Sequence, residues 1–304
     1  DFGAEVIKIE APGTGDPMRD VGAVKFRGRG LTWPTQSRNK KCITLNLRKP
    51  EGQALARRLV ERADVVVENF RPGTMEKWGL GYEDLRQVNP GLIFVRVSGY
   101  GQTGPYRHRA GFGSAGGAMG GLRYLTGYPD QPPPRVGLSI EDSLASLQAV
   151  IGTLLALYHR DRKDRPAGVG QVVDVSILEA VFAMTEGMVT EYGLTGYVRQ
   201  RSGSVLPGWA PSNIYQARDG LWMVIAANAN NPFKRLFELM GYPEIAHNPK
   251  YETHEGRWED RDLFDELIGR WAAQRTSHEI TEQLEAAGVP SAPIYSAAEM
   301  LDDP

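Results

Sequence analysis

Cysteine and histidine are scarce in this chain of 304 residues. Cys42 is the single cysteine, so the chain forms no internal disulfide, and a cytoplasmic location fits this composition. The five histidines are scattered, and the sequence contains neither an H-x-x-x-H nor a C-x-x-C pair. We therefore predict no catalytic metal.

Several other signals are missing as well. The formal net charge is only −2 and no basic block stands out, which argues against nucleic acid as a partner. The longest apolar runs, such as 144–157, contain polar residues and are too short to span a bilayer, and no signal peptide is visible. The glycine-rich segment 12–16 lacks the G-x-G-x-x-G spacing and the Walker lysine, and no G-x-S-x-G elbow occurs. These absences argue against a nucleotide loop, a serine hydrolase and a membrane protein.

The hydrophobic pattern predicts strands that alternate with helices through the first two thirds of the chain. Predicted strands lie at 5–10, 42–47, 63–68, 92–97 and 172–175, and predicted helices begin at 49 or cover 82–88, 144–160 and 176–192. Such alternation with short links predicts an α/β, doubly wound, Rossmann-like sheet. The glycines between 111 and 121 favour close helix packing over a ligand loop.

The pattern changes at 197–211, where Gly, Ser and Pro interrupt it. We predict a large domain at 1–196, a linker or lid loop at 197–211 and a small α+β domain at 212–304. The small domain should contain a hairpin at 214–227 with an Asp219-Gly220 turn, followed by helices near 232–240, 261–274 and 277–287. The chain opens at Asp1 within a recognisable unit, so we expect the large domain to lack its N-terminal part.

Asp142 stands just before the predicted helix at 144–160. A carboxylate at the start of a helix is favoured by the positive end of the helix dipole and can cap its exposed N–H groups. Position alone leaves a structural cap and a reactive carboxylate both open.

Five motifs around this residue add a second line of argument. They are the segments 1–10, 68–73, 98–105, 135–143 and 170–180. In this order and at these intervals they resemble the class III CoA-transferases, the family of formyl-CoA transferase and carnitine CoA-transferase. The resemblance covers nearly the whole chain. It implies an interlocked homodimer, each subunit having a Rossmann-like large domain and a small domain.

In that family an aspartate at the place of Asp142 is the covalent nucleophile. The implied reaction moves CoA from an acyl-CoA donor to a free carboxylic acid through an aspartyl-CoA thioester, with CoA as substrate and no tightly bound cofactor. Dividing the transfer over a protein carboxylate replaces one hard step with easier ones. The segment 203–213 is similar to members that use succinyl-CoA and a small dicarboxylate. As its neighbour, Glu141 should point elsewhere, so we assign it no catalytic role.

The resemblance also implies a CoA site. Its predicted residues are Leu45, Arg48, Asn69, Phe70, Lys77 and Trp78. Asn69 and Phe70 would meet the pantetheine and adenine side, Leu45 would contact adenine, and Arg48 would bind a phosphate. Ordinary solvated surface is the alternative for Arg48 and for Lys77.

Four residues are candidates for contact with the substrate. Gly203 and Gly208 lie where the family has a glycine-rich loop that closes over the nucleophile, although a plain interdomain linker is an equal alternative. Arg109 either holds a substrate carboxylate or forms a surface ion pair. Phe112 stands where the racemase branch of the family has a histidine of its acid/base pair, which weakens that alternative. An α-methylacyl-CoA racemase and a catalytically silent CoA-binding paralogue remain the other hypotheses.

Overall fold

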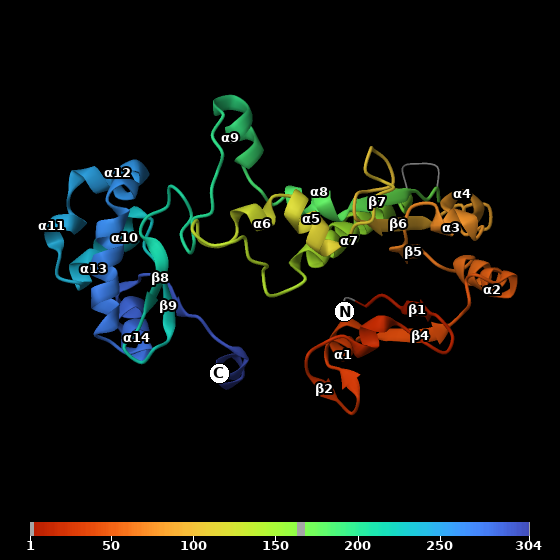
Figure 1. The fold of residues 1–304 in the computed structure, drawn as a ribbon, viewed down its shortest axis with the longest axis horizontal. Coiled ribbons are helices and arrows are strands. Elements are labelled where there is room, and N and C mark those ends of the chain that lie inside the picture. The colour runs from red at the N-terminus through yellow and green to blue at the C-terminus, as the bar shows by residue number, and fades with distance from the viewer. Residues whose placement is uncertain (1–2, 163–167, 304) are drawn as a thin grey trace. The chain divides into compact units, whose positions relative to one another are not determined.

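The computed structural model describes residues 3–162 and 168–303. It divides into two compact units, coloured by position along the chain in Figure 1. Unit 1 comprises Asp1–Arg123 and Val136–Thr195, and unit 2 comprises Tyr124–Arg135 and Gly196–Pro304. The segment Tyr124–Arg135, predicted from the sequence as part of the large domain, thus belongs to unit 2.

Unit 1 combines parallel strands with helices. Its strands are β1 (Val6–Glu10), β2 (Lys25–Phe26), β3 (Arg29–Gly30), β4 (Lys40–Thr44), β5 (Val65–Glu68), β6 (Ile93–Ser98) and β7 (Val172–Ser176). Its helices are α1 (Thr32–Gln36), α2 (Pro50–Val60), α3 (Thr74–Lys77), α4 (Tyr82–Leu85), α5 (Gly113–Met119), α7 (Ile140–Arg160), α8 (Ile177–Phe182) and α9 (Met188–Thr195), with a 3-10 turn at Pro17–Asp20. The short helix α6 (Leu122–Leu125) lies at the boundary with unit 2.

The centre of unit 1 is the parallel sheet β5-β6-β7. Ile93 and Val95 of β6 pack with the small residues of α7, whereas Phe94 packs with residues of α2, α3 and α4. All three side chains are fully buried, which explains why β6 is an unbroken apolar run. The predicted α/β class with helices on both faces of a parallel sheet is confirmed, and Figure 1 shows α7 lying along β6 and β7.

The strands near the N-terminus form sheets of their own. β1 and β4 pair in parallel, and β2 and β3 form a short antiparallel hairpin. The predicted strand 42–47 lies earlier than expected, at Lys40–Thr44. The chain turns after Leu45, where the N–H of Lys49 donates to the carbonyl of Asn46 at 3.0 Å, and α2 follows at once.

Helix α7 starts earlier than the apolar run suggested. Ile140 is its first residue and Ser139 its N-cap, without a side-chain capping bond. Its buried alanines, among them Ala145 and Ala149, pack on the sheet. The helix has 21 residues and by length and composition could cross a membrane, a test that core helices also pass, so the expectation that this run is too short was wrong. Only 22% of its most apolar window is buried within the structure.

Helix α5 packs against both α7 and α8, and glycines make the close approach possible. A Cβ on Gly116 would lie 2.8 Å from the side chain of Ile177, and one on Gly120 would lie 2.8 Å from the side chain of Val181. Both distances are far inside van der Waals contact, so these positions require glycine. The predicted close packing of this glycine-rich segment is confirmed.

The predicted helix 176–192 is wrong, because the chain forms two helices there, α8 and α9. The hydroxyl of Thr185 donates to the carbonyl of Phe182 at 2.8 Å, and Glu186 adopts a left-handed φ of 52°. Thr185, the left-handed Glu186 and Gly187 thus lie between the two helices and prevent one continuous helix.

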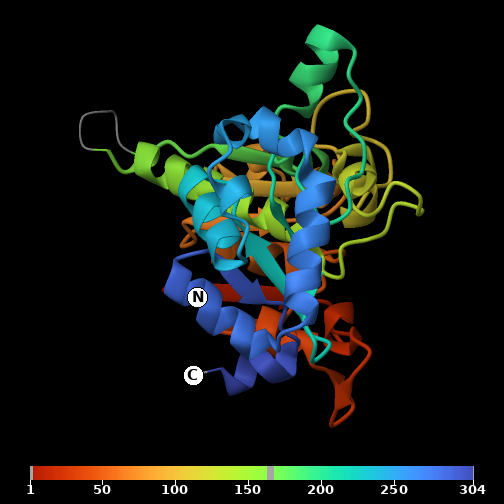
Figure 2. The ribbon, with the colours of Figure 1, turned by 90° about the vertical axis from the view of Figure 1, so that its left-hand side faces the viewer.

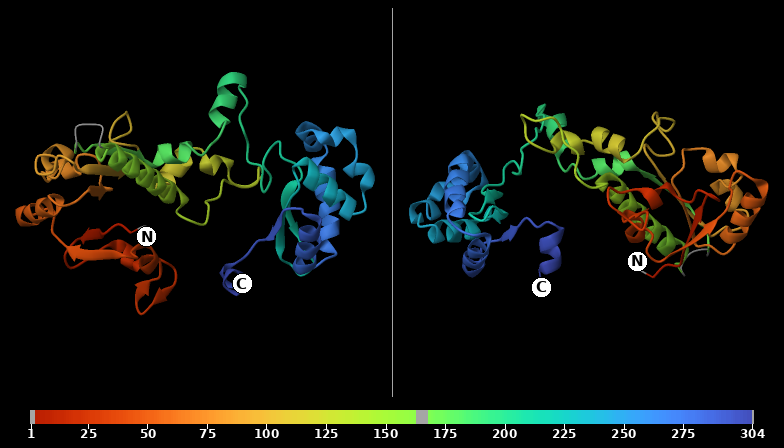
Figure 3. Two further views of the ribbon diagram at one scale, coloured as in Figure 1. Left: turned by 180° about the vertical axis from the view of Figure 1, so that it is seen from behind. Right: turned by 60° about the horizontal axis from the view of Figure 1, so that its bottom comes forward.

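Unit 2 is an antiparallel sheet covered by helices. Its strands are β8 (Ser212–Gln216), β9 (Trp222–Ala226) and β10 (Ser291–Pro293), in the order β10-β9-β8. Its helices are α10 (Asn230–Leu239), α11 (Pro243–Ala246), α12 (His254–Glu259), α13 (Arg261–Ala273), α14 (Ser277–Ala287) and α15 (Ala297–Asp302), with a 3-10 turn at Pro249–Glu252. Met223 and Ile225 of β9 are fully buried beneath Phe233, Phe237 and Phe264, and Figures 2 and 3 show the helices gathered along the strands. The predicted hairpin is confirmed.

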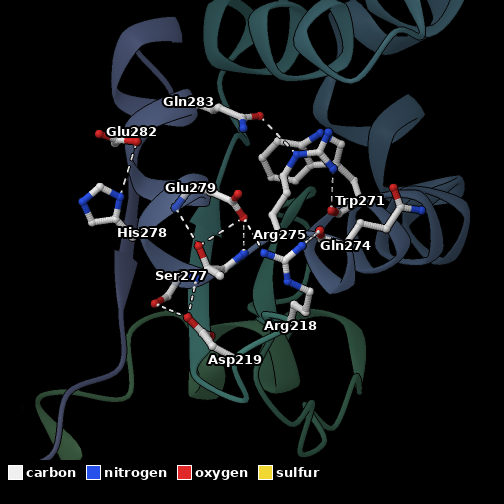
Figure 4. A network of polar contacts seen from close by, with 11 residues as sticks. Arg218, Asp219, Trp271, Gln274, Arg275, Ser277, His278, Glu279, Glu282 and Gln283 are labelled. Atoms are coloured by element: carbon white, nitrogen blue, oxygen red, sulfur yellow. Dashed lines mark hydrogen bonds and ion pairs between the residues drawn. The ribbon is translucent and has the colours of Figure 1, made fainter.

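The turn of this hairpin is tied to the start of α14 (Figure 4). Asp219 accepts hydrogen bonds from the N–H and the hydroxyl of Ser277, both at 2.8 Å. Thr276 and Glu279 form a capping box, and Arg218 donates to Glu279 at 3.2 Å. Reciprocal capping of this kind satisfies N–H groups that a helix start otherwise leaves open.

Candidate active site

Asp142 is the third residue of α7 and not its N-cap, which corrects the capping hypothesis. Its side chain is exposed, and its carboxylate lies beside α5. A Cβ on Gly113 would lie 2.8 and 3.0 Å from the two carboxylate oxygens of Asp142, so the glycine leaves them room. An exposed carboxylate in the first turn of a long helix, next to a residue without a side chain, is open to an approaching reactant and lies at the positive end of the helix dipole.

Phe112 and Arg109 come just before this glycine. Phe112 is the N-cap of α5 and is 70% exposed, so an exposed apolar residue immediately precedes Gly113, the glycine beside the Asp142 carboxylate. The guanidinium carbon of Arg109 lies 3.8 Å from the ring centroid of Tyr106, a cation–π contact. The side chain of Arg109 is exposed, so its charge remains accessible to an anion.

The motifs 98–105 and 170–180 meet in space. The N–H of Gln102 donates to both carboxylate oxygens of Asp174, at 3.1 and 2.9 Å. A cavity of about 220 Å³ opens beside this contact, and its walls include Tyr100, Tyr106 and Glu179. The loop after β6 is therefore fastened to β7 at the carboxyl end of the sheet, where ligands of parallel α/β sheets bind.

The turn that follows β5 carries Asn69 and Phe70, and a buried ion pair fixes it. Glu68 accepts the N–H of Phe70 at 2.7 Å and the Nε–H of Arg96 at 2.7 Å. Arg96, in the middle of β6, also donates to both carboxylate oxygens of Glu76 on α3, at 2.6 and 3.2 Å. No sequence pattern indicates this network, because its members lie in three separate elements.

The charges in this network respond differently to burial. Burial raises the pKa of Glu68, and the hydrogen bonds from Arg96 and Phe70 only partly oppose it. For Glu76, burial also acts to raise the pKa, but hydrogen bonds led by those from Arg96 leave it below its ordinary value. Arg96 therefore favours the ionised form of Glu76, whereas burial disfavours the ionised form of Glu68.

The other predicted CoA residues lie in the same unit as this turn. Phe70 is 39% exposed, and its ring meets that of Trp78 edge-on with centroids 5.1 Å apart. Lys77 is exposed at the last position of α3. Leu45 is partly buried against the cluster of α2 and α3, whereas Arg48 is exposed just beyond it. Unit 1 therefore contains the six predicted residues, with two exposed cations among them.

The loop 12–16 is held by the flanking side chains of Glu10 and Arg19. Glu10 accepts two hydrogen bonds from Arg19, both at 2.9 Å, and one from the N–H of Asp16 at 3.1 Å. A Cβ on Gly15 would lie 3.1 Å from the carboxylate of Glu10, so the absence of a side chain at Gly15 leaves room for this carboxylate. This structural role of Gly15 agrees with the expectation that the segment is no phosphate loop.

Gly203 and Gly208 belong to unit 2. Both have positive φ angles, 68° and 86°, and a Cβ on Gly203 would lie 2.5 Å from the ring of Tyr128. The N–H of Gly203 donates to the carbonyl of Gly127 at 3.0 Å. These contacts explain why Gly203 is glycine, and its contact with substrate stays a prediction.

Comparison with known proteins places the chain in one family. The model of CoA-transferase family III matches residues 1–304. The succinyl-CoA–D-citramalate CoA-transferase of Chloroflexus aurantiacus is 55% identical over 304 residues, covering 100% of this chain and 75% of that protein. The acetyl-CoA:oxalate CoA-transferase of Acetobacter aceti is 34% identical over 305 residues, covering 100% of this chain and 77% of that protein. A CAIB/BAIF family protein from Brucella suis has a similar structure, with a TM-score of 0.84 and 34% identity, covering 100% of this chain and 80% of that chain.

Proposed function

Because the chain belongs to CoA-transferase family III and is a CoA-transferase, we propose that it moves CoA from an acyl-CoA donor to a free carboxylic acid through a covalent intermediate on Asp142. The observation that carries the proposal is the exposed carboxylate of Asp142 in the first turn of α7, which has room beside α5 because Gly113 has no side chain. The dipole of this helix stabilises negative charge that develops nearby during attack on a carbonyl.

The proposed cycle exchanges one acyl bond at a time. An oxygen of Asp142 attacks the thioester carbonyl of the donor, the C–S bond breaks, and CoA leaves as a thiolate. The thiolate then attacks the aspartyl carbonyl of the mixed anhydride, which releases the donor acid as a carboxylate and leaves an aspartyl-CoA thioester. The acceptor carboxylate repeats the two steps in reverse, and Asp142 is regenerated. Each step is an acyl transfer to an adjacent nucleophile, which is easier than direct exchange.

The turn after β5 is the proposed CoA site. Asn69 and Phe70 are held at the carboxyl end of the sheet, and the exposed ring of Phe70 offers an apolar surface to pantetheine and adenine. Lys77 and Arg48 are exposed cations that suit the phosphates. Trp78 and Leu45 are partly buried and support the site from within the core of unit 1.

We propose succinyl-CoA as donor and a small dicarboxylic acid as acceptor. The support is the 55% identity to a transferase whose name joins succinyl-CoA and D-citramalate, together with relatives named for malate and glutarate. Arg109 is the cation proposed to hold the second carboxylate, since its guanidinium is exposed on the ring of Tyr106. The proposed contribution of Gly203 and Gly208 is a loop that covers the substrate.

The proposed assembly is a cytoplasmic homodimer. One side of α7 is apolar and open in the single chain, at Leu147, Val150, Ile151, Leu154, Leu155 and Tyr158, each at least 49% exposed. These positions recur at helical spacing and form a stripe of the kind that marks a protein interface. Light scattering over a range of protein concentrations should give the mass of a dimer, and the mass of a monomer throughout would contradict the assembly.

Mass spectrometry tests the covalent step directly. After incubation with succinyl-CoA, the intact protein should gain an adduct, and hydroxylamine should convert Asp142 to a hydroxamate. The Asp142→Asn variant should lose both the adduct and CoA transfer while still binding CoA. Asp84→Asn, an exposed aspartate on α4, is the matched control and should behave as wild type.

Two results would contradict the proposal. A wild-type protein that gains no adduct from succinyl-CoA or from other acyl-CoA donors is not a transferase of this kind. Exchange of the α-proton of a 2-methylacyl-CoA for deuterium, without labelling of Asp142, would instead identify a racemase.

A further inference from the structure

Two acidic side chains in the first turn of α7 lie against the same face of α5. Asp142 faces Gly113, and Glu141 faces Gly117, where a Cβ would lie 2.4 Å from Oε1 of Glu141. The two glycines are four residues apart, so they are neighbours on one side of the helix, about 5–6 Å from each other. Adjacent residues at this helix start thus reach two different glycines of α5, one helical turn apart.

The two carboxyl groups differ sharply in their exposure. Asp142 is exposed, whereas Glu141 is only 1% exposed and is among the few buried charged residues of the described chain. Its Oε2 is buried and has no hydrogen-bond partner among residues 3–162 and 168–303. Burying a carboxyl group without full pairing is unfavourable, and such a group in a native fold calls for an explanation.

The space for Glu141 is made by the absence of a side chain at Gly117. The nearest atoms to a Cβ at that position are all from Glu141, namely Oε1, Cγ and Cδ, at 2.4, 2.9 and 3.0 Å. The side chain of Glu141 thus fills the gap between α5 and α7 one helical turn away from the contact of Asp142 with Gly113. A residue that occupies this gap sets the distance between the two helices at the first turn of α7.

We propose that Glu141 is a positioning residue for Asp142. Resting on the proposed function of Asp142, the inference is that the buried side chain of Glu141 holds the first turn of α7 on α5, and so keeps the nucleophilic oxygen where the thioester carbonyl approaches. A misplacement of about 1 Å in a reacting group costs about 10²-fold in rate. Loss of Glu141 should therefore slow acylation of Asp142, while CoA binding at the turn after β5 stays unchanged.

Single-turnover labelling of Asp142 by saturating succinyl-CoA, followed by mass spectrometry, tests the inference. Glu141→Ala should label about 10²-fold more slowly than wild type, with an unchanged Kd for CoA. Glu141→Gln keeps the shape of the side chain and should label within a few-fold of wild type. Glu83→Gln, an exposed glutamate on α4, is the control and should match wild type.

Gly117→Ala supplies a second, independent perturbation. Its methyl group would push into Oε1 of Glu141, so this variant should also label slowly. In the Glu141→Ala background the same methyl group enters empty space and should cause no further loss, which makes the two substitutions non-additive. If Glu141→Ala does not fold, Gly117→Ala by itself still decides the question.

The outcomes separate this inference from the proposed function. A wild-type rate of labelling in Glu141→Ala or in Gly117→Ala overturns the positioning role and leaves the transferase intact. Equal losses from Gly117→Ala in both backgrounds would also overturn it, since the two residues would then act apart. A wild-type protein that is never labelled refutes the transferase proposal itself, and the positioning role with it.

Discussion

Replacing Arg96 by methionine should leave Glu68 as a buried carboxyl group without its arginine. The side chain of Glu68 is 2% exposed and that of Arg96 is 10% exposed, so water cannot take over the lost contacts. Removal of one partner from a buried ion pair typically costs about 3–5 kcal/mol. The lost contact with Glu76 adds little, because Glu76 is 45% exposed and solvent screens it.

Protonation of Glu68 limits this cost and makes it depend on pH. Taking a carboxyl group of ordinary pKa 4.5 to its neutral form at pH 7 costs about 3.4 kcal/mol, at 1.36 kcal/mol per unit. Burial already raises the pKa of Glu68, and loss of Arg96 raises it further. Because the pKa is higher in the folded than in the unfolded state, stability is highest at low pH and is lost as pH rises above about 4.5. We expect a loss of about 3 kcal/mol at pH 7 and under about 1 kcal/mol at pH 5.

The loss of stability is measured by hydrogen exchange in increasing urea, read on peptides that cover β5 and β6. A local measurement is needed because the chain has two units, which need not unfold together. Arg96→Met combined with Glu68→Gln should recover most of the stability at pH 7, because no charge is then left buried. Arg86→Met is the matched control, since its pair with Glu83 is exposed on both sides. Equal destabilisation at pH 7 and pH 5, or a double variant as unstable as Arg96→Met, would refute the electrostatic reasoning and assign the loss to packing.

Two further predictions concern other polar contacts. Hydrogen bonds from Arg19 hold the pKa of Glu10 below its ordinary value of 4.5. The pairing therefore stabilises β1 fully above pH 4.5, and this stabilisation is lost as pH falls through the lowered pKa of the folded state. Glu10→Gln should abolish that acid transition in hydrogen exchange of the β1 peptide, and an unchanged transition would exclude Glu10 as its source. In unit 2, the hydroxyl of Tyr215 donates to Asp265 at 2.6 Å, and burial raises the pKa of Tyr215 well above its ordinary value of 10. Tyr215→Phe should lower the free energy of unfolding by about 1.5–3 kcal/mol, measured by urea unfolding followed by circular dichroism. An unchanged free energy of unfolding would mean that water replaces the hydrogen bond.

Features that depend on neighbouring residues were predictable from the sequence. The apolar run in β6 predicted a strand buried on both faces, and the structure confirms it. The predicted helix 277–287 coincides with α14, whose capping box is a local pattern. The Asp219-Gly220 turn predicted the β8–β9 hairpin, and Gly220 has the positive φ of 88° that such a turn needs.

Errors arose where local pattern and backbone geometry disagree. The apolar residues of 176–192 continue at helical spacing, but the left-handed backbone at Glu186 divides the segment into two helices. The apolar run of α7 predicted a start near Leu144, whereas the helix begins at Ile140 because polar first-turn residues belong to it. Helix starts of this kind carry polar residues, so hydrophobic periodicity places them too late.

The sequence by itself determined the α/β class, most of the strands and helices, and the family resemblance that singled out Asp142. These features rest on periodicity, turn residues and motif order, all of which are local along the chain. The tertiary structure alone decided that Glu141 and Asp142 face two glycines of α5, and that Arg96 pairs with Glu68, 28 residues away. Such contacts join elements that are distant in sequence, and the identity of one residue does not indicate which distant residue it will contact in the folded chain.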